Sequence, residues 1–112
     1  MSYSKFLEEL FYDMKSRAKT MSPSESYTAY LANLSNEAVG KKLMEEAFEL
    51  SVANIEMRDD NGRDELIGEA ADVIYHLMAM LVTKDIEFSE VVKKLEDRGG
   101  VNKIDKINFK KD

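Results

Sequence analysis

Hydrophobic residues recur at intervals of three and four along most of the chain, which predicts helices, and no segment alternates as a half-buried strand does. From about residue 4 to residue 17 the apolar side chains share one stripe, as they do on an amphipathic helix. The pattern stops around Pro23, the only proline, and Ser26 can then cap a short helix that reaches Leu31. This part of the chain therefore predicts an amphipathic helix, a linker and a short helix.

Three further helices are expected. Ser35 or Asn36 can cap a third helix that runs to about residue 57, and Asp64 can cap a fourth that runs to about residue 82. The turn between them is acidic, but its glycine spacing does not fit an EF-hand calcium loop. A fifth helix is expected from about residue 87 to residue 98, with three apolar residues facing inward: Val91, Val92 and Leu95. The predicted fold class is all-α, a bundle of four to five helices.

The third and fourth helices are apolar on almost every side, apart from one narrow polar sector on each. The sector of the third helix holds a lysine and four glutamates: Lys42, Glu45, Glu46, Glu49 and Glu56. The sector of the fourth helix holds Glu69, Asp72 and His76. A helix that is apolar on nearly all sides is buried, and a chain of this size needs a partner subunit to bury it. We therefore expect homo-oligomerisation to complete the bundle.

The acidic residues form two matched pairs, because Glu46 and Glu49 are three residues apart and so are Glu69 and Asp72. Two such helices packed antiparallel would bring four carboxylates together. Solvated faces with local ion pairs are the ordinary explanation of glutamate-rich helices, but the fourth helix offers no lysine or arginine to neutralise its pair. Because buried carboxylates are costly and oxygen ligands select hard cations, the hypothesis is a site for magnesium or manganese.

His76 is the only histidine, and its position decides between two kinds of metal site. Carboxylate di-iron bundles need Glu-x-x-His motifs, whereas His76 comes seven residues after Glu69 and four after Asp72. We therefore interpret His76 as a hydrogen-bonding residue near Asp72 at the helix interface, in preference to a direct metal ligand.

Length, charge and cysteine content narrow the class of protein. A chain of 112 residues fits one domain, and the absence of cysteine excludes disulfides and thiolate metal sites. The formal net charge of −6 argues against nucleic acid and anionic membrane as partners. No apolar run approaches the ~20 residues that a membrane span needs, so we expect a soluble, cytoplasmic protein. Because the end of the chain is polar and locally basic, we divide it into a domain, residues 1–98, and a tail, residues 99–112.

The order Glu45-Glu46-x-x-Glu49 followed by Glu69-x-x-Asp72 resembles the signature of the MazG-like, all-α nucleoside triphosphate pyrophosphatase superfamily. Within it, the chain most resembles the phosphoribosyl-ATP pyrophosphatase family. The stretches that carry this likeness run in family order from about residue 6 to residue 98: Ser26-Tyr27-Thr28, Lys41-Lys42, the segment from Glu69 to Leu77, and the segment from Phe88 to Leu95. The chain departs from the family at Met44, where glycine is usual, and in a span between Glu49 and Glu69 that is about one helical turn longer.

The resemblance implies magnesium-dependent hydrolysis of phosphoribosyl-ATP to phosphoribosyl-AMP and pyrophosphate, a step of histidine biosynthesis, by a homodimer or homotetramer. The metal ligands on this hypothesis are the two matched pairs: Glu46, Glu49, Glu69 and Asp72. Glu45 would activate the attacking water or hold a further metal. Lys42 would contact phosphate oxygens, or instead form an ion pair with the neighbouring glutamates. Lys41 is expected to point elsewhere on the helix.

Two alternatives stay open. The longer span between the acidic pairs leaves room for a different nucleotide, as in a house-cleaning pyrophosphatase that acts on nucleoside or deoxynucleoside triphosphates. A non-enzymatic helical oligomerisation module would also expose apolar helix faces, and it would require no metal.

Overall fold

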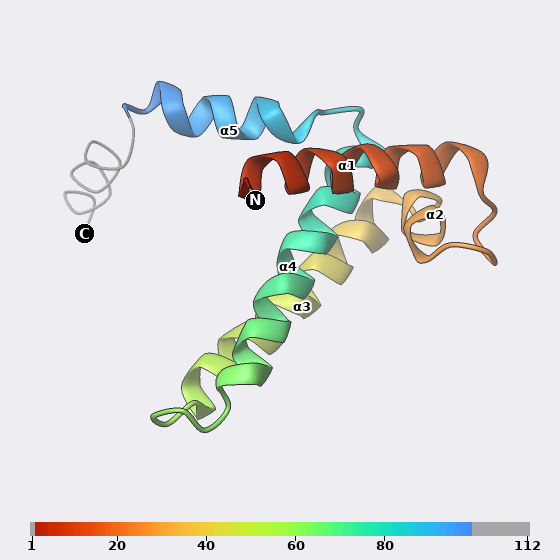
Figure 1. The fold of residues 1–112 in the computed structure, drawn as a ribbon. Helices are drawn as coiled ribbons and strands as arrows, with labels where there is room; N and C mark the ends of the chain where they lie inside the picture. The colour runs from red at the N-terminus through yellow and green to blue at the C-terminus, as the bar shows by residue number, and fades with distance from the viewer. Residues whose placement is uncertain (1, 100–112) are drawn as a thin grey trace.

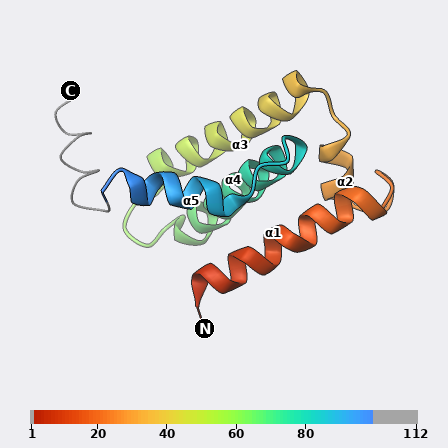
Figure 2. The same ribbon diagram turned by 90° about the horizontal axis from the view of Figure 1, so that it is seen from above.

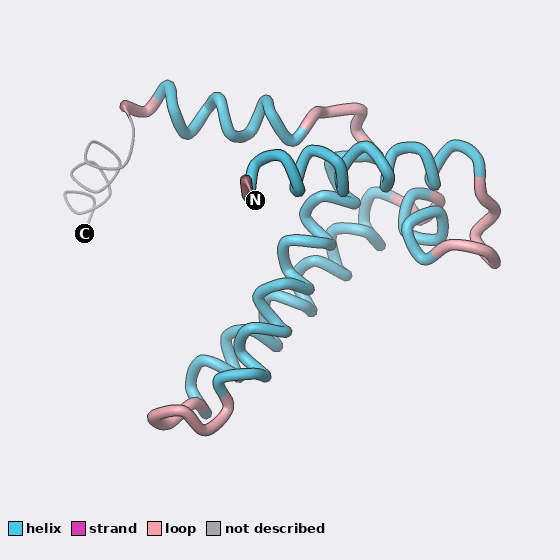
Figure 3. The backbone as a smooth tube through the Cα atoms, in the orientation of Figure 1, coloured by secondary structure: helices cyan, strands magenta, loops and turns pink. Residues whose placement is uncertain are grey.

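The computed structural model describes residues 2–99, which form five helices joined by short connections (Figure 1). They are α1 (Tyr3–Thr20), α2 (Tyr27–Ala32), α3 (Asn36–Glu56), α4 (Arg63–Thr83) and α5 (Phe88–Asp97). Figure 3 shows only helix and loop among these residues. The all-α prediction is confirmed. All but the first residue of the predicted tail, residues 99–112, lies outside the described part of the chain.

Side-chain caps begin two of the helices where the sequence places them. The Ser26 hydroxyl accepts a hydrogen bond from the backbone N–H of Ala29 at 3.2 Å, and the Ser35 hydroxyl accepts one from Ala38 at 3.1 Å. These bonds satisfy backbone donors that the first turn of a helix leaves free. The two caps therefore define where α2 and α3 begin.

The expected cap of α4 is wrong. The residue before the helix is Gly62, at a φ of +81°, and Asp64 lies within the first turn and caps no backbone group. A left-handed backbone suits glycine because it has no Cβ. The negative charges of Asp64 and Glu65 then stabilise the helix through its dipole.

Helices α3 and α4 form an antiparallel hairpin (Figures 1 and 2), and Figure 1 shows that its turn stands clear of the other helices. At the opposite end of the hairpin, α1 and α2 pack against α4 and enclose the core. Its buried residues are Phe11, Met14, Leu31, Met78 and Ala79. The hydrophobic core thus holds one end of the hairpin, and the acidic sectors of α3 and α4 lie farther along it.

Within a single chain α3 and α4 are less buried than their all-round apolar character predicts. Five large side chains on them are exposed: Met44, Phe48, Ile55, Ile67 and Ile74. By length and composition α4 could cross a membrane, contrary to the expectation from sequence, although core helices of soluble proteins meet the same criteria. Along α5, Val91 is half-buried, whereas Val92 and Leu95 are exposed, so the inward-facing prediction fails for those two.

Candidate functional site

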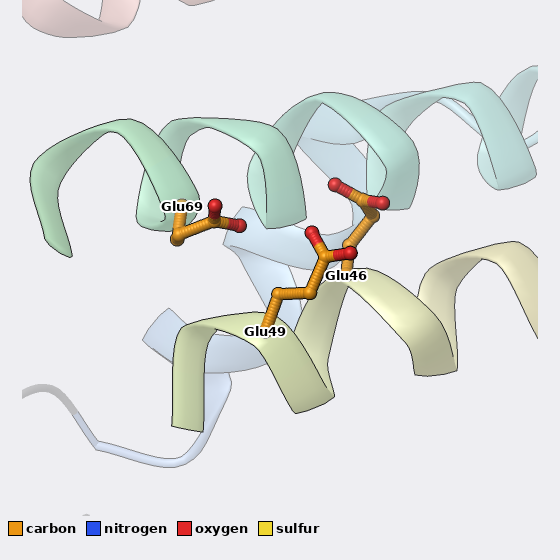
Figure 4. Close-up of side chains that lie close together, drawn as sticks. All are labelled: Glu46, Glu49 and Glu69. Atoms are coloured by element: carbon orange, nitrogen blue, oxygen red, sulfur yellow. The ribbon is translucent and has the colours of Figure 1, made fainter. Parts of the chain in front are cut away.

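Three carboxylates from the two long helices meet in the middle of the hairpin (Figure 4). One oxygen each from Glu46, Glu49 and Glu69 lies within 4.8 Å of the other two. The three-residue spacing puts the first two on adjacent turns of α3, and the antiparallel packing brings Glu69 of α4 opposite them. The acidic sectors of the two helices therefore face each other.

The carboxylates of this cluster are partly shielded from solvent. Glu46 is buried, with 7% of its surface exposed, and the Oε2 atom of Glu69 is buried with no hydrogen-bond donor among the described residues. The pKa of Glu69 is raised, first by desolvation and then by the negative charges of Glu49, Asp72 and Glu46. Each of these causes penalises the ionised form, and a cation among the carboxylates would reverse that penalty.

The donor set fits a hard divalent cation. All three close ligand atoms are carboxylate oxygens, and oxygen donors suit magnesium, calcium or manganese rather than copper or zinc. On a solvated acidic face, water would hydrogen-bond to every carboxylate oxygen. The buried Oε2 of Glu69 has no such partner among the described residues, so a solvated face does not explain it. The described residues thus form a cluster able to hold a metal.

The fourth expected ligand, Asp72, is not among the carboxylates that meet. Its side chain is exposed, while its backbone carbonyl accepts a hydrogen bond from Nδ1 of His76 at 2.7 Å. It lies one turn along α4 from Glu69, and its charge contributes to the raised pKa of that residue. The structure therefore brings three of the four predicted ligands together and leaves Asp72 at the edge of the cluster.

Lys42 lies beside the cluster, with its Nζ 3.8 Å from a carboxylate oxygen of Glu46. The ion pair that the sequence offered as one interpretation of Lys42 is thus present. The pKa of Lys42 is raised, first by the neighbouring Tyr27 phenol and then by Glu46, Glu45 and Glu49. Lys42 remains charged at neutral pH and stands where it can meet an anion next to the carboxylates.

A hollow of about 450 Å³ opens over this part of α3. It is lined by the cluster residues Glu46 and Glu49, by Glu45, and by both lysines of the Lys41-Lys42 pair. Lys41 lies on a neighbouring side of α3 from Lys42, but the hollow is wide and open and reaches round to include it. Cations and carboxylates line the same surface.

Sequence reasoning missed two hydrogen bonds between α2 and α4. The Tyr27 hydroxyl lies 2.9 Å from Nε2 of His76, and the Thr28 hydroxyl lies 2.5 Å from the hydroxyl of Tyr75. His76 is buried, as its interpretation as a hydrogen-bonding residue requires. Ser26-Tyr27-Thr28 and the segment from Glu69 to Leu77 were both recognisable in the sequence, but they are almost fifty residues apart, which concealed the hydrogen bonds between them.

Comparison with known proteins adds independent information. Residues 7–99 match the family model described as phosphoribosyl-ATP pyrophosphohydrolase. The phosphoribosyl-ATP pyrophosphatase of Ignicoccus hospitalis is 41% identical over 95 residues, which cover 85% of this chain and 88% of that protein. The protein of the same name from Paramagnetospirillum magneticum is 39% identical over 102 residues, 91% of this chain and 89% of that one.

A bifunctional relative contains a similar segment. The histidine biosynthesis bifunctional protein HisIE of Wolinella succinogenes is 34% identical over 106 residues, which cover 95% of this chain and 44% of that protein. No solved structure matches the chain. The family match covers α1 from residue 7 onward and the whole of α2 to α5, and it includes every residue of the acidic cluster. The chain belongs to the phosphoribosyl-ATP pyrophosphohydrolase family.

Proposed function

We propose that this protein hydrolyses the α–β phosphoanhydride of phosphoribosyl-ATP, releasing phosphoribosyl-AMP and pyrophosphate, as a cytoplasmic step of histidine biosynthesis. Family membership and the names of its relatives support the substrate. The observation that carries the chemistry is the cluster of Glu46, Glu49 and Glu69 beside a lysine-bearing hollow. A polyphosphate needs both cations to neutralise it and a surface that fixes the linkage to be cleaved.

The proposed metal ligands are Glu46, Glu49, Glu69 and Asp72, and the proposed ion is magnesium, with manganese as a substitute. The close approach of three carboxylates and the unpartnered oxygen of Glu69 support this assignment. When bound, such an ion neutralises polyphosphate charge and stabilises the charge that develops on the leaving pyrophosphate. The protein's net charge of −6 would otherwise repel the substrate.

Two side chains on α3 have roles of their own in this proposal. Glu45 is exposed and lines the hollow, so its carboxylate can accept the proton of a water that attacks the α-phosphorus. The bond from that phosphorus to the bridging oxygen breaks as the new P–O bond forms. Lys42, one turn before Glu46, donates to phosphate oxygens and holds the polyphosphate against the cluster.

Removing single carboxylates tests the metal assignment. Glu49→Gln and Asp72→Asn should each abolish magnesium-dependent pyrophosphate release while the helical circular dichroism spectrum stays unchanged. Glu56→Gln, on the same helix and outside the cluster, is the matched control and should keep full turnover. Retained turnover in either of the first two variants would contradict the assignment.

The substrate needs a separate test, because Met44 stands 72% exposed in the wall of the hollow and its bulk alters the shape of that surface. Phosphoribosyl-ATP, ATP, dCTP and dUTP are compared at equal concentration. We expect the first to have the highest kcat/KM. A preference for a deoxynucleotide would make the protein a house-cleaning pyrophosphatase, and a lack of any turnover or metal response would leave an oligomerisation module.

We further propose that the domain of residues 1–98 assembles as a homodimer or homotetramer through α3 and α4, and that residues 99–112 form a tail outside it. The exposed apolar side chains of these two helices support the assembly, because an interface between copies would remove them from water. Ile55→Glu should shift the mass measured by light scattering toward the monomer, since Ile55 is 75% exposed. Tyr3→Glu, at an 88% exposed position on α1, is the control.

A further inference from the structure

The hydrogen bonds around His76 fix which way the Tyr27 hydroxyl points its proton. A backbone carbonyl can only accept, so the 2.7 Å contact with the carbonyl of Asp72 requires His76 to carry its proton on Nδ1. In the neutral ring Nε2 is then an acceptor, and the Tyr27 O–H donates to it at 2.9 Å. The only proton of the Tyr27 hydroxyl is therefore in the hydrogen bond to His76. Tyr27 presents only oxygen lone pairs to its remaining surroundings.

Those surroundings are a second hollow, of about 430 Å³, between α2 and α3. Tyr27 and Tyr30 form one wall, with their rings stacked at a centroid distance of 5.9 Å and each side chain close to half exposed. Lys41 and Lys42 form the other wall. Lys41 is exposed and makes no ion pair with any described residue. The volume lies within the usual range for small-molecule sites, about 300 to 1,000 Å³.

The two hollows are neighbours with opposite charge balance. Both are lined by Lys41, Lys42 and Glu45. The hollow over the acidic cluster adds Glu46 and Glu49, so its carboxylates outnumber its ammonium groups by one. The hollow beside the tyrosines adds no further charge, and its ammonium groups outnumber its carboxylates by one. The first needs a cation before it can bind an anion, whereas the second can bind an anion directly.

We propose that the hollow between α2 and α3 binds a sugar phosphate, namely the phosphoribosyl arm of the substrate, with its phosphate on Lys41 and a ribose hydroxyl donating to the Tyr27 oxygen. This inference rests on the proposed function. Phosphoribosyl-ATP differs from ATP by this arm, so a site for it beside the metal cluster would distinguish the two. His76 is a positioning residue, because it acts by holding the Tyr27 hydroxyl in its orientation.

A binding titration with ribose 5-phosphate tests the hollow without any turnover. The amide and side-chain NMR signals of Tyr27 and Lys41 should shift on titration. Lys41→Gln should weaken binding about tenfold or more, because a hydrogen bond to a charged group is lost, and Tyr27→Phe about three- to tenfold. Controls are Lys94→Gln on α5 and Tyr12→Phe on α1, which lie outside the hollow. An absence of shifts at the hollow, or equal weakening in the controls, would overturn the inference.

Turnover then separates this inference from the proposed function. Lys41→Gln, Tyr27→Phe and His76→Gln should each lower the ratio of kcat/KM for phosphoribosyl-ATP to that for ATP, chiefly through a higher KM for phosphoribosyl-ATP. If the wild type cleaves phosphoribosyl-ATP but these ratios do not change, the inference fails and the function stands. If the wild type does not cleave phosphoribosyl-ATP, the function fails, and the ribose 5-phosphate titration alone decides what the hollow binds.

Discussion

Replacing Glu49 by glutamine should raise the melting temperature without magnesium and should reduce the further rise that magnesium produces. Without metal, the substitution removes one of three negative charges whose oxygens lie within 4.8 Å of one another, so repulsion falls and the melting temperature rises. With magnesium, the same substitution removes a ligand, so the stabilisation that metal binding adds becomes smaller. A solvated acidic face predicts neither change, because water already screens its charges.

The size of the metal effect follows from linkage. A ligand at ten times its Kd stabilises the native state by about 1.4 kcal/mol, since the gain is RT ln(1 + [L]/Kd). For 112 residues the entropy of unfolding is about 0.2 kcal/mol per kelvin, at ~2.1 cal/mol/K per residue. Wild-type protein should therefore melt about 6 °C higher at that magnesium concentration. We expect less than half of this increment in Glu49→Gln.

Differential scanning calorimetry at constant ionic strength measures both effects, with sodium chloride replacing magnesium chloride in the reference. Glu56→Gln controls for the loss of a negative charge elsewhere on α3. An equal magnesium increment in wild type and Glu49→Gln would refute the role of Glu49 as a ligand. No increment in the wild type would refute the metal site as a whole.

Three further outcomes are expected. Leu31→Ala should lower the free energy of unfolding in urea by about 2 to 5 kcal/mol, because Leu31 is fully buried in the core. Thr28→Val should lower it by about 1 to 3 kcal/mol, because the Tyr75 hydroxyl loses its partner at 2.5 Å, and a change near zero would show that another group replaces Thr28. Because the pKa of Glu69 is raised in the folded protein, the stability that its protonated form contributes is present below the ordinary glutamate pKa and is lost as pH rises through the folded value. Urea unfolding of the metal-free protein at several pH values should show this decline, and Glu69→Gln should reduce it.

Helices and their approximate ends could be predicted from local pattern alone. The spacing of apolar residues depends on the helical repeat, and caps such as Ser26 and Ser35 act within four residues, so both are visible in a short window. The start of α4 was mispredicted because Gly62 adopts a left-handed backbone, and the sequence offered Asp64 as a plausible cap nearby. The ends of helices depend on backbone conformation, which side-chain identity only partly determines.

The local sequence also determines which carboxylates are neighbours within one helix, because a spacing of three residues puts Glu46 beside Glu49 in any α-helix. Only the tertiary structure decided which of them meet across helices. The register of α3 against α4 brings Glu69 into the group and leaves Asp72 outside it. That register depends on the length of the turn and on the packing of the whole hairpin, which no local pattern encodes.

The contacts of α2 show the same division. Sequence identified Tyr27, Lys41 and His76 as members of separate elements, and it did not show that Tyr27 and Lys41 line one hollow. In the folded protein Tyr27 bonds to His76 and lies opposite Lys41. The hollow between them has more ammonium groups than carboxylates, and it lies beside a cluster of carboxylates. Sequence alone determined the helices, the acidic pairs and the family resemblance, because these reside in local spacing and order. Tertiary structure decided which charges share a surface, because distance in space between helices is set by long-range packing.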